Sequence, residues 1–349
     1  MGEHTKIEWC DHTFNPWRGC SKVAAGCANC YAERQAKRNP TALGTWGPEG
    51  TRVNASETAW KQPVRWNRKA SRLLSAWAKG VELHGGDEAA CVAAGYIQPQ
   101  RPRVFCGSMC DVFEDRPDLE APRRRLFDMI YRLTALDWLI LTKRPDVAYE
   151  WIGGPSGAGL AEWPVHFPSH VWLGFSASTQ ADLDRGIPQL LECPAAVRFL
   201  SLEPLLEPID LQAVYGALPE GAIDCNYGES HRLGQCNCQR GVDWVLVGGE
   251  FGPLPRPCNV EWIRSIVQQC RAAGVPCFVE QLGAKPYTTN RLGVGGSSNG
   301  MFRNWIARYG THLQLESHEE YIPIGGPVDP KGANPEEWPE DLRVRDFPT

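Results

Sequence analysis

The sequence predicts an α/β fold built on a parallel β-sheet, either a (β/α) barrel or a partial TIM-like barrel. Two observations support this fold class. Seven short runs of apolar, β-branched and aromatic residues recur along the 349-residue chain, and segments long enough for crossover helices separate them. Each run also ends in polar side chains capable of chemistry, as is typical of parallel sheets whose active sites lie at the carboxyl ends of the strands.

The predicted strands are short apolar runs bounded by polar or turn residues, and they span residues 7–13, 103–108, 138–142, 171–176, 197–201, 244–248 and 276–280. Some intervening segments have apolar residues at helical spacing, which predicts helices over residues 122–136, 181–191 and 260–273. The last of these is followed by Gly274 and Pro276, which stop a helix. Because strands and helices alternate, the sheet is expected to be parallel.

The first predicted strand leads into a loop with three cysteines, Cys20, Cys27 and Cys30, in a C-x6-C-x2-C array. Three thiolates on one short loop can hold an iron-sulfur cluster by three corners and leave the fourth iron open to a small molecule. A zinc site is an alternative, with its fourth ligand supplied by Cys10, His12 or Cys110, and unliganded thiols are another. The sequence contains no second C-x2-C pair, which disfavours zinc.

Composition limits the class of protein. With 42% hydrophobic residues the chain can bury one large core or two smaller ones. Residues 1–8 are polar and no run of 18 uncharged apolar residues occurs, so we expect neither a secretory signal nor a membrane span. Fourteen cysteines in such a chain indicate a reducing compartment, and we expect a cytoplasmic protein.

Charge is distributed unevenly along the chain. The net charge of -5 excludes a globally basic nucleic-acid binder. Between residues 31 and 80, however, ten Lys and Arg occur with three acids, and tryptophans lie among them at positions 46, 60, 66 and 77. The stretch 34–79 therefore suits a surface that neutralises phosphates and stacks bases, and nucleic acid or a nucleotide is the expected partner. The alternative is a helix with its tryptophans in the core and its cations in water.

Polar residues follow every predicted strand and supply the candidate site. Lys143 or Arg144 suits a carboxylate or a phosphate, because a guanidinium offers bidentate donors to either. Ser176 and Glu203 suit ribose hydroxyls or an ammonium group. We assign catalytic roles to Lys143, Glu203 and Glu250, and cofactor-binding or substrate-facing roles to Tyr31, Ser108, Asp111, Arg144, Ser176 and Gln281.

A second cysteine group has the spacing C-x5-H-x4-C-x-C and consists of Cys225, His231, Cys236 and Cys238. It can form a small zinc knot or ligate an auxiliary cluster, and the alternative is a surface loop with incidental thiols.

The predicted organisation is one barrel domain over residues 1–314, followed by an irregular arm over 315–349. The domain includes a basic, tryptophan-rich insertion at 31–100 and the cysteine-rich insertion at 215–241. The arm is rich in Pro, Gly and acids, and we expect it to pack on the barrel through its apolar residues, Tyr321, Trp338, Leu342 and Phe347.

Short motifs spread along nearly the whole chain carry a family resemblance. They are IEWCDHTFNPW at 7–17, CYA at 30–32, LTKRP at 141–145, VWLG at 171–174, RFLSLEPLL at 198–206, VGGE at 247–250 and WPEDLR at 338–343. In these motifs the chain resembles a family of uncharacterised phage-encoded and bacterial three-cysteine proteins within the radical S-adenosylmethionine superfamily.

The resemblance implies a barrel of the radical S-adenosylmethionine type. Cys20, Cys27 and Cys30 would hold a [4Fe-4S] cluster whose fourth iron binds the amino and carboxylate groups of S-adenosylmethionine. An electron from a donor such as flavodoxin or ferredoxin would cleave that cosubstrate to methionine and a 5'-deoxyadenosyl radical, which abstracts hydrogen from the substrate.

Two features depart from the superfamily pattern. The first cysteine gap holds six residues instead of three, and Asn29 stands where an aromatic residue usually precedes the last cysteine, so Tyr31 is the candidate to stack on the adenine. The Gly248-Gly249-Glu250 stretch follows the sixth predicted strand instead of the second.

Three functions remain open on the sequence. The first is a radical enzyme that modifies or repairs a nucleic-acid base or nucleotide, which the cysteine loop, the basic stretch and the phage association favour. The second is a radical enzyme acting on a small metabolite or a peptide. The third is a non-catalytic, zinc-stapled nucleic-acid-binding protein.

Overall fold

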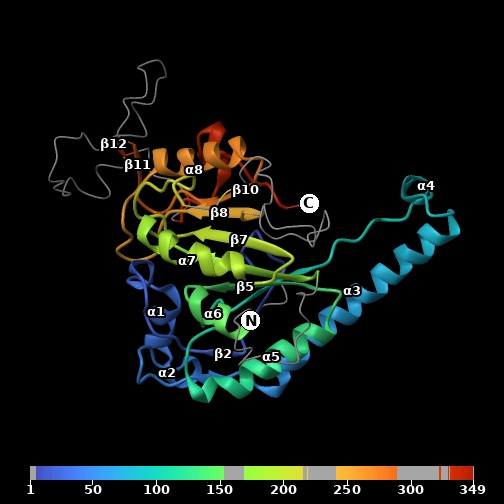
Figure 1. Cartoon of the computed structure of the whole chain (residues 1–349), viewed down its shortest axis with the longest axis horizontal. Coiled ribbons are helices and arrows are strands. Elements are labelled where there is room, and N and C mark those ends of the chain that lie inside the picture. The colour runs from blue at the N-terminus through green and yellow to red at the C-terminus, as the bar shows by residue number, and fades with distance from the viewer. Residues whose placement is uncertain are drawn as a thin grey trace, which may run out of the picture. The chain divides into compact units, whose positions relative to one another are not determined.

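The computed structural model describes residues 5–152, 169–214, 218, 241–288, 322–323, 329 and 331–348 (Figure 1). Its main sheet has seven strands in the order β1-β4-β5-β6-β7-β8-β10. Their bounds are β1 (His12–Phe14), β4 (Arg103–Cys106), β5 (Asp137–Thr142), β6 (Val171–Ser176), β7 (Val197–Leu202), β8 (Trp244–Gly248) and β10 (Cys277–Gln281). The pairs β1–β4, β4–β5, β7–β8 and β8–β10 are parallel. The predicted α/β class with a parallel sheet is confirmed.

The strand order also decides between the two arrangements that the sequence left open. β1 and β10 stand at opposite ends of the order, and within the described residues they do not pair with each other. The sheet is therefore open, as in a partial barrel, and a closed barrel is wrong. The first strand is shorter than predicted because the chain turns before it, with the Cys10 amide donating to the Ile7 carbonyl at 3.3 Å.

In the described part of the chain, helices follow β4, β5, β6 and β8 and lead to the next strand of the main sheet. They are α5 (Glu120–Arg132), α6 (Pro145–Ile152), α7 (Gln180–Glu192) and α8 (Val260–Ala272). Each of α5, α7 and α8 buries one stripe of apolar residues, in α8 Ile263, Ile266, Val267 and Cys270. All residues of β6 and β8 are buried, which explains why both strands appear in the sequence as continuous apolar runs.

Two compact units make up the chain. The first comprises residues 1–22, 32–174 and 193–196, and the second comprises 23–31, 175–192 and 197–349. The division falls inside the three-cysteine loop, so Cys20 belongs to the first unit, whereas Cys27 and Cys30 belong to the second.

In the first unit, residues 31–100 form helices and one short strand, which pairs with a second short strand earlier in the chain. They comprise α1 (Tyr31–Arg38), whose first residue belongs to the second unit, α2 (Pro40–Leu43), α3 (Glu57–Leu83), α4 (Glu88–Ala93), and β3 (Val53–Asn54) paired with β2 (Trp17–Arg18). The helix α3 begins at Ser56, whose side chain accepts a hydrogen bond from the Ala59 amide at 3.3 Å. Trp60 and Trp66 of α3 are buried, so they pack in the core instead of offering faces to bases.

In the second unit, the C-terminal segment runs along the edge of the sheet. The Val279 amide donates to the Val344 carbonyl and the Asp346 amide to the Cys277 carbonyl, both at 2.9 Å. Trp338 and Leu342 of this segment are buried. A smaller sheet lies in the same unit, with strands β9 (Cys258–Asn259), β11 (Pro286–Thr288) and β12 (Ile322–Pro323) in the order β12-β11-β9. Tyr321 lies outside the described residues.

None of the helices in the described part of the chain has the length and hydropathy needed to cross a membrane.

The first residue of β5 carries a pH-dependent contribution to stability. Burial raises the pKa of Asp137 to about 6, although Arg101 lies nearby, with 3.6 Å between its Nη1 and Asp137 Oδ1. Because the folded-state pKa lies above the ordinary value of 3.8, folding favours the protonated form, and this contribution is lost as the pH rises through 6.

We expect Asp137→Asn to raise the free energy of unfolding at pH 8 by roughly 2 kcal/mol, and the gain to vanish as the pH falls from 6 to 4. Urea denaturation at several pH values measures this. Asp128→Asn, at an exposed site on α5, is the control. A gain that is the same at every pH would contradict this account.

Candidate functional site

In the first unit, the candidate site residues are those of the segment around Cys20. Gly19 has a φ of 107°, and a side chain there would meet the Thr51 carbonyl oxygen at 2.7 Å, so the close turn before Cys20 requires glycine. The Gly19 amide donates to the Met109 carbonyl at 3.2 Å, and the Gly47 amide donates to the Cys20 carbonyl at 3.0 Å. Backbone hydrogen bonds thus fix the chain at Gly19 and at Cys20.

Arg144, which follows β5, reaches this segment with its guanidinium. Its Nη2 donates to the Ser21 carbonyl oxygen at 2.9 Å, and its Nη1 lies 3.9 Å from Cys20 Sγ. The same Nη1 donates to Asp111 Oδ2 at 2.8 Å, and both charged side chains are buried. The Arg144 guanidinium therefore positions the cysteine segment, and its predicted binding of a carboxylate or a phosphate stays a prediction.

Asp111 has no vacant carboxylate oxygen in this arrangement. Its Oδ1 accepts from the Thr142 hydroxyl at 2.7 Å and from the Phe113 amide at 3.0 Å. Its Oδ2 accepts from the Lys143 amide at 3.0 Å as well as from Arg144. Asp111 thus joins the ends of β4 and β5, and that it faces a substrate stays a prediction.

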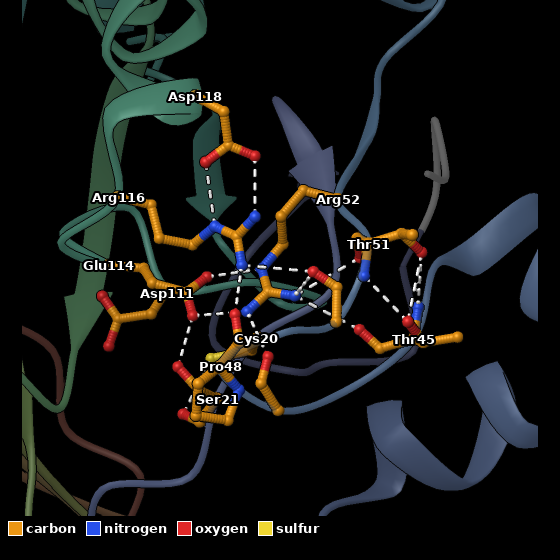
Figure 2. A network of polar contacts seen from close by, with 12 residues as sticks. Cys20, Ser21, Thr45, Pro48, Thr51, Arg52, Asp111, Glu114, Arg116 and Asp118 are labelled. Atoms are coloured by element: carbon orange, nitrogen blue, oxygen red, sulfur yellow. Dashed lines mark hydrogen bonds and ion pairs between the residues drawn. The ribbon is translucent and has the colours of Figure 1, made fainter.

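A second ion pair lies in the same network as Cys20 (Figure 2). Arg52 donates to both carboxylate oxygens of Glu114, at 2.7 and 2.6 Å, and the two side chains are only 1% and 2% exposed. Glu114 also forms a short hydrogen bond with the Ser21 hydroxyl. A bidentate pair of this kind has a defined geometry, so it fixes the segment that carries Cys20. The motifs in the sequence pointed to neither Arg52 nor Glu114.

The environment of Cys20 disfavours a bare thiolate. Burial is the largest effect and the Asp111 carboxylate the next, and together they outweigh Arg144 and raise the pKa of Cys20 to about 12. The thiol is therefore protonated at neutral pH when no cation binds it. A metal ion that binds this sulfur must displace its proton.

The second-unit part of the candidate site is the turn that carries Cys27 and Cys30. Residues Ala25–Cys27 form a short 3-10 helix, η1, and the Cys30 amide donates to the Cys27 carbonyl at 3.4 Å. Both thiols therefore lie on one tight turn, and both side chains are partly exposed.

Glu250 binds this turn after β8. Its Oε2 accepts from Asn29 Nδ2 at 2.9 Å, and Arg256 donates to both oxygens, at 2.6 Å to Oε1 and 2.9 Å to Oε2. Arg256 also donates to the Ala25 carbonyl at 2.9 Å. Burial acts to raise the pKa of Glu250, but these hydrogen bonds outweigh it and the pKa lies below its usual value. Glu250 is an ionised clamp on this turn, and its catalytic role stays a prediction.

The glycines before Glu250 have a packing role. A side chain at Gly249 would meet the Leu282 carbonyl oxygen at 2.4 Å, and one at Gly248 would meet the Gln281 carbonyl oxygen at 3.1 Å. The two glycines therefore allow the ends of β8 and β10 to approach each other closely.

Most of the remaining predicted residues lie at strand ends of their own units, and Tyr31 is the first residue of α1. Gln281 donates a short hydrogen bond to Glu203, so the ends of β7 and β10 bring these two together. Ser176 is buried at the end of β6, and the ring of Tyr31 stacks on Phe251 with 6.4 Å between centroids. In the first unit, Lys143 is half-buried, and Ser108 accepts from Asn15 Nδ2 at 2.9 Å. Cys225, His231, Cys236 and Cys238 lie outside the described residues.

The three candidates for a fourth zinc ligand are buried or packed against an aromatic ring. Cys10 and Cys110 are buried, and burial raises the pKa of the Cys110 thiol. The His12 ring stacks on Trp66 with 4.2 Å between centroids. In the described ranges, no group of three or more His, Cys, Asp or Glu side chains is arranged as a ready-made metal site.

Exposure separates the loop cysteines from the others. Among the eleven cysteines in the described part of the chain, eight are buried, and only Cys20, Cys27 and Cys30 are partly exposed. Thiolate sulfur is the usual ligand of iron-sulfur clusters, so the chemistry of this donor set fits three corners of such a cluster.

Comparison with known proteins identifies the family of the chain. No curated protein and no solved structure matches it. One family model matches residues 4–321, which is most of the sequence. The chain therefore belongs to the family described as "Protein of unknown function (DUF5131)".

Proposed function

We propose that this protein is a radical S-adenosylmethionine enzyme that modifies or repairs a nucleic-acid base or nucleotide. The observation that carries the proposal is the selective exposure of Cys20, Cys27 and Cys30 among the described cysteines. Cysteines that serve only to pack are normally buried, whereas ligands for an exchangeable cofactor must be accessible. The family resemblance of the motifs around this loop adds S-adenosylmethionine as the cosubstrate.

When bound, the cluster and S-adenosylmethionine would supply an electron and a carbon-centred radical for hydrogen abstraction, with flavodoxin or ferredoxin as the electron donor. The residues of the chain would position this chemistry. Arg144 places positive charge beside the Cys20 sulfur, which favours the thiolate. The Asn29–Glu250–Arg256 clamp orders the turn of Cys27 and Cys30.

Two side-chain groups are suited to contact the organic ligands. The Glu203 carboxylate, paired with Gln281, suits ribose hydroxyls or an ammonium group. Lys143 is half-buried at the end of β5, and its ammonium suits a phosphate. A zinc-stapled binding protein is less well supported, since its candidate fourth ligands are buried or stacked.

We expect the anaerobically reconstituted protein to bind about four irons per chain and to absorb near ~400 nm. A Cys20→Ala, Cys27→Ala, Cys30→Ala variant should lose both signals because the ligands are removed. The matched control replaces three buried cysteines by alanine, Cys91, Cys193 and Cys258. It should keep both the iron and the absorption band if circular dichroism shows that it remains folded. Stoichiometric zinc without the absorption band would reject the cluster.

The substrate class needs a second measurement on the reconstituted wild type. We expect reductive cleavage of S-adenosylmethionine, followed as 5'-deoxyadenosine formed, and we expect DNA, RNA or a nucleotide to stimulate it. Cleavage that responds to none of these would reject the nucleic-acid substrate and favour a small metabolite or a peptide.

A further inference from the structure

One face of α3 carries a row of exposed cations opposite the face by which the helix packs. The buried residues Ala59, Pro63, Trp66 and Ala70 recur at intervals of three and four and form the packing face. Five cations recur at similar intervals, Lys61, Arg65, Arg68, Arg72 and Lys79, and all are exposed. At 100° per residue they fall within an arc of about 60° on the opposite side of the helix. We call these five residues the α3 cationic row.

The cations of this row outnumber the acids of the same helix. The sequence of α3 contains no Asp or Glu between residues 58 and 81. Within the described residues, no member of the row takes part in a salt bridge, whereas on α5 Arg124 pairs with Glu120 and Arg125 with Glu57. Because Arg125 binds Glu57 through both oxygens, at 2.6 and 2.7 Å, the acid at the start of α3 is already paired.

The length of the row indicates an extended anion. Lys79 lies 18 positions after Lys61, which is roughly 27 Å along the helix axis at 1.5 Å per residue. A free nucleotide can contact only one or two neighbouring cations of such a row. A nucleic-acid strand, with a phosphate about every 3.4 Å along the duplex axis, can contact all of them.

We propose that the α3 cationic row is the docking surface for the phosphodiester backbone of a nucleic acid. The inference rests on the proposed function, because it identifies how that substrate class is held. The buried indoles of Trp60 and Trp66 cannot stack bases, so the contact is to phosphates and does not depend on base sequence.

A membrane surface fits these observations less well. A helix that lies in a membrane interface inserts an apolar face, whereas the apolar stripe of α3 packs inside its own unit. The exposed apolar residues of α3, Val64, Leu73 and Leu83, lie on different sides of the helix and form no continuous apolar face.

The test compares two variants of the full-length protein that remove the same charge. The first replaces the five cations of the row by glutamine. The control replaces five other exposed cations by glutamine, Lys37, Arg38, Arg132, Arg185 and Arg271. Fluorescence anisotropy measures the affinity for a labelled mixed-sequence duplex and single strand at several salt concentrations, and circular dichroism checks that both variants keep their helices.

We expect the wild type and the control to bind both probes with a logarithmic salt slope of about -3 to -5, and the row variant to lose at least ~100-fold in affinity and most of that slope. Equal binding by both variants would overturn the docking surface. If the protein binds phosphatidylserine vesicles through the row and binds neither nucleic-acid probe, the nucleic-acid docking surface is overturned and the row is a membrane-binding surface.

The iron content of the same preparations separates this inference from the proposed function. Nucleic-acid binding through the row in a protein that cannot be loaded with iron would support the docking surface and reject the radical mechanism. If the protein binds iron but the row variant binds nucleic acid as well as the control does, the docking surface is overturned and the proposed function is not.

Discussion

Replacing Glu114 by glutamine should lower the free energy of unfolding by about 3–5 kcal/mol, the usual cost of removing one partner from a buried ion pair. Glu114 is the bidentate partner of Arg52, and the Arg52 side chain is only 1% exposed. Its guanidinium would keep its hydrogen bonds to the Gly47 and Gly50 carbonyl oxygens but lose its counter-charge. Urea denaturation measures the change.

The control for this prediction is Glu120→Gln, which removes an exposed carboxylate paired with Arg124 and should cost less than about 1 kcal/mol. The double variant Arg52→Met, Glu114→Leu removes both charges, and its loss should be smaller than the sum of the two single losses. A loss for Glu114→Gln as small as that of the control would show that the buried pair does not support the Cys20 segment.

Replacing Glu250 by glutamine should lower the iron content of the reconstituted protein in the absence of S-adenosylmethionine. Glu250 accepts hydrogen bonds from Asn29 and Arg256, so its charge orders the turn that carries Cys27 and Cys30. A hydrogen bond to a charged group contributes about 1.5–3 kcal/mol, so we expect retention of the cluster under a competing chelator to fall roughly 10- to 100-fold. Iron released per chain over time measures it.

The same variant distinguishes the clamp from a direct ligand of the cosubstrate. If Glu250 held the methionine amine, its replacement would leave the iron content unchanged and weaken binding of S-adenosylmethionine alone. Glu261→Gln is the matched control, because Glu261 also pairs with an arginine in the same unit, Arg264, at 2.6 Å. If both variants retain iron equally well, the role of Glu250 in ordering the turn of Cys27 and Cys30 is contradicted.

The strands were predictable because a buried strand consists largely of apolar residues, which can be recognised in the sequence. β6 and β8 have the predicted bounds, since strands buried along their whole length consist of continuous apolar residues. The beginning of the first strand was not predictable. Trp9 and Cys10 are as apolar as strand residues, but they lie in a turn whose hydrogen bonds a pattern of side chains does not reveal.

The candidate site was predictable only in part. Polar residues after the strands were correctly located at the strand ends, as parallel topology requires. Their roles could not be predicted, since Asp111 and Glu250 look like open carboxylates in the sequence and are occupied by donors in the structure. Arg52 lies 62 positions from Glu114, so no local spacing could connect the two.

The α/β class, the positions of most strands and the presence of the three-cysteine loop follow from the sequence alone, because they depend on hydrophobic periodicity and on residue type. Packing decides that the loop cysteines stay partly exposed, which carboxylates are already paired, and that Trp60 and Trp66 are buried while the α3 cations are exposed. Exposure and ion pairing depend on neighbours from distant parts of the chain, so no local pattern in the sequence reveals them.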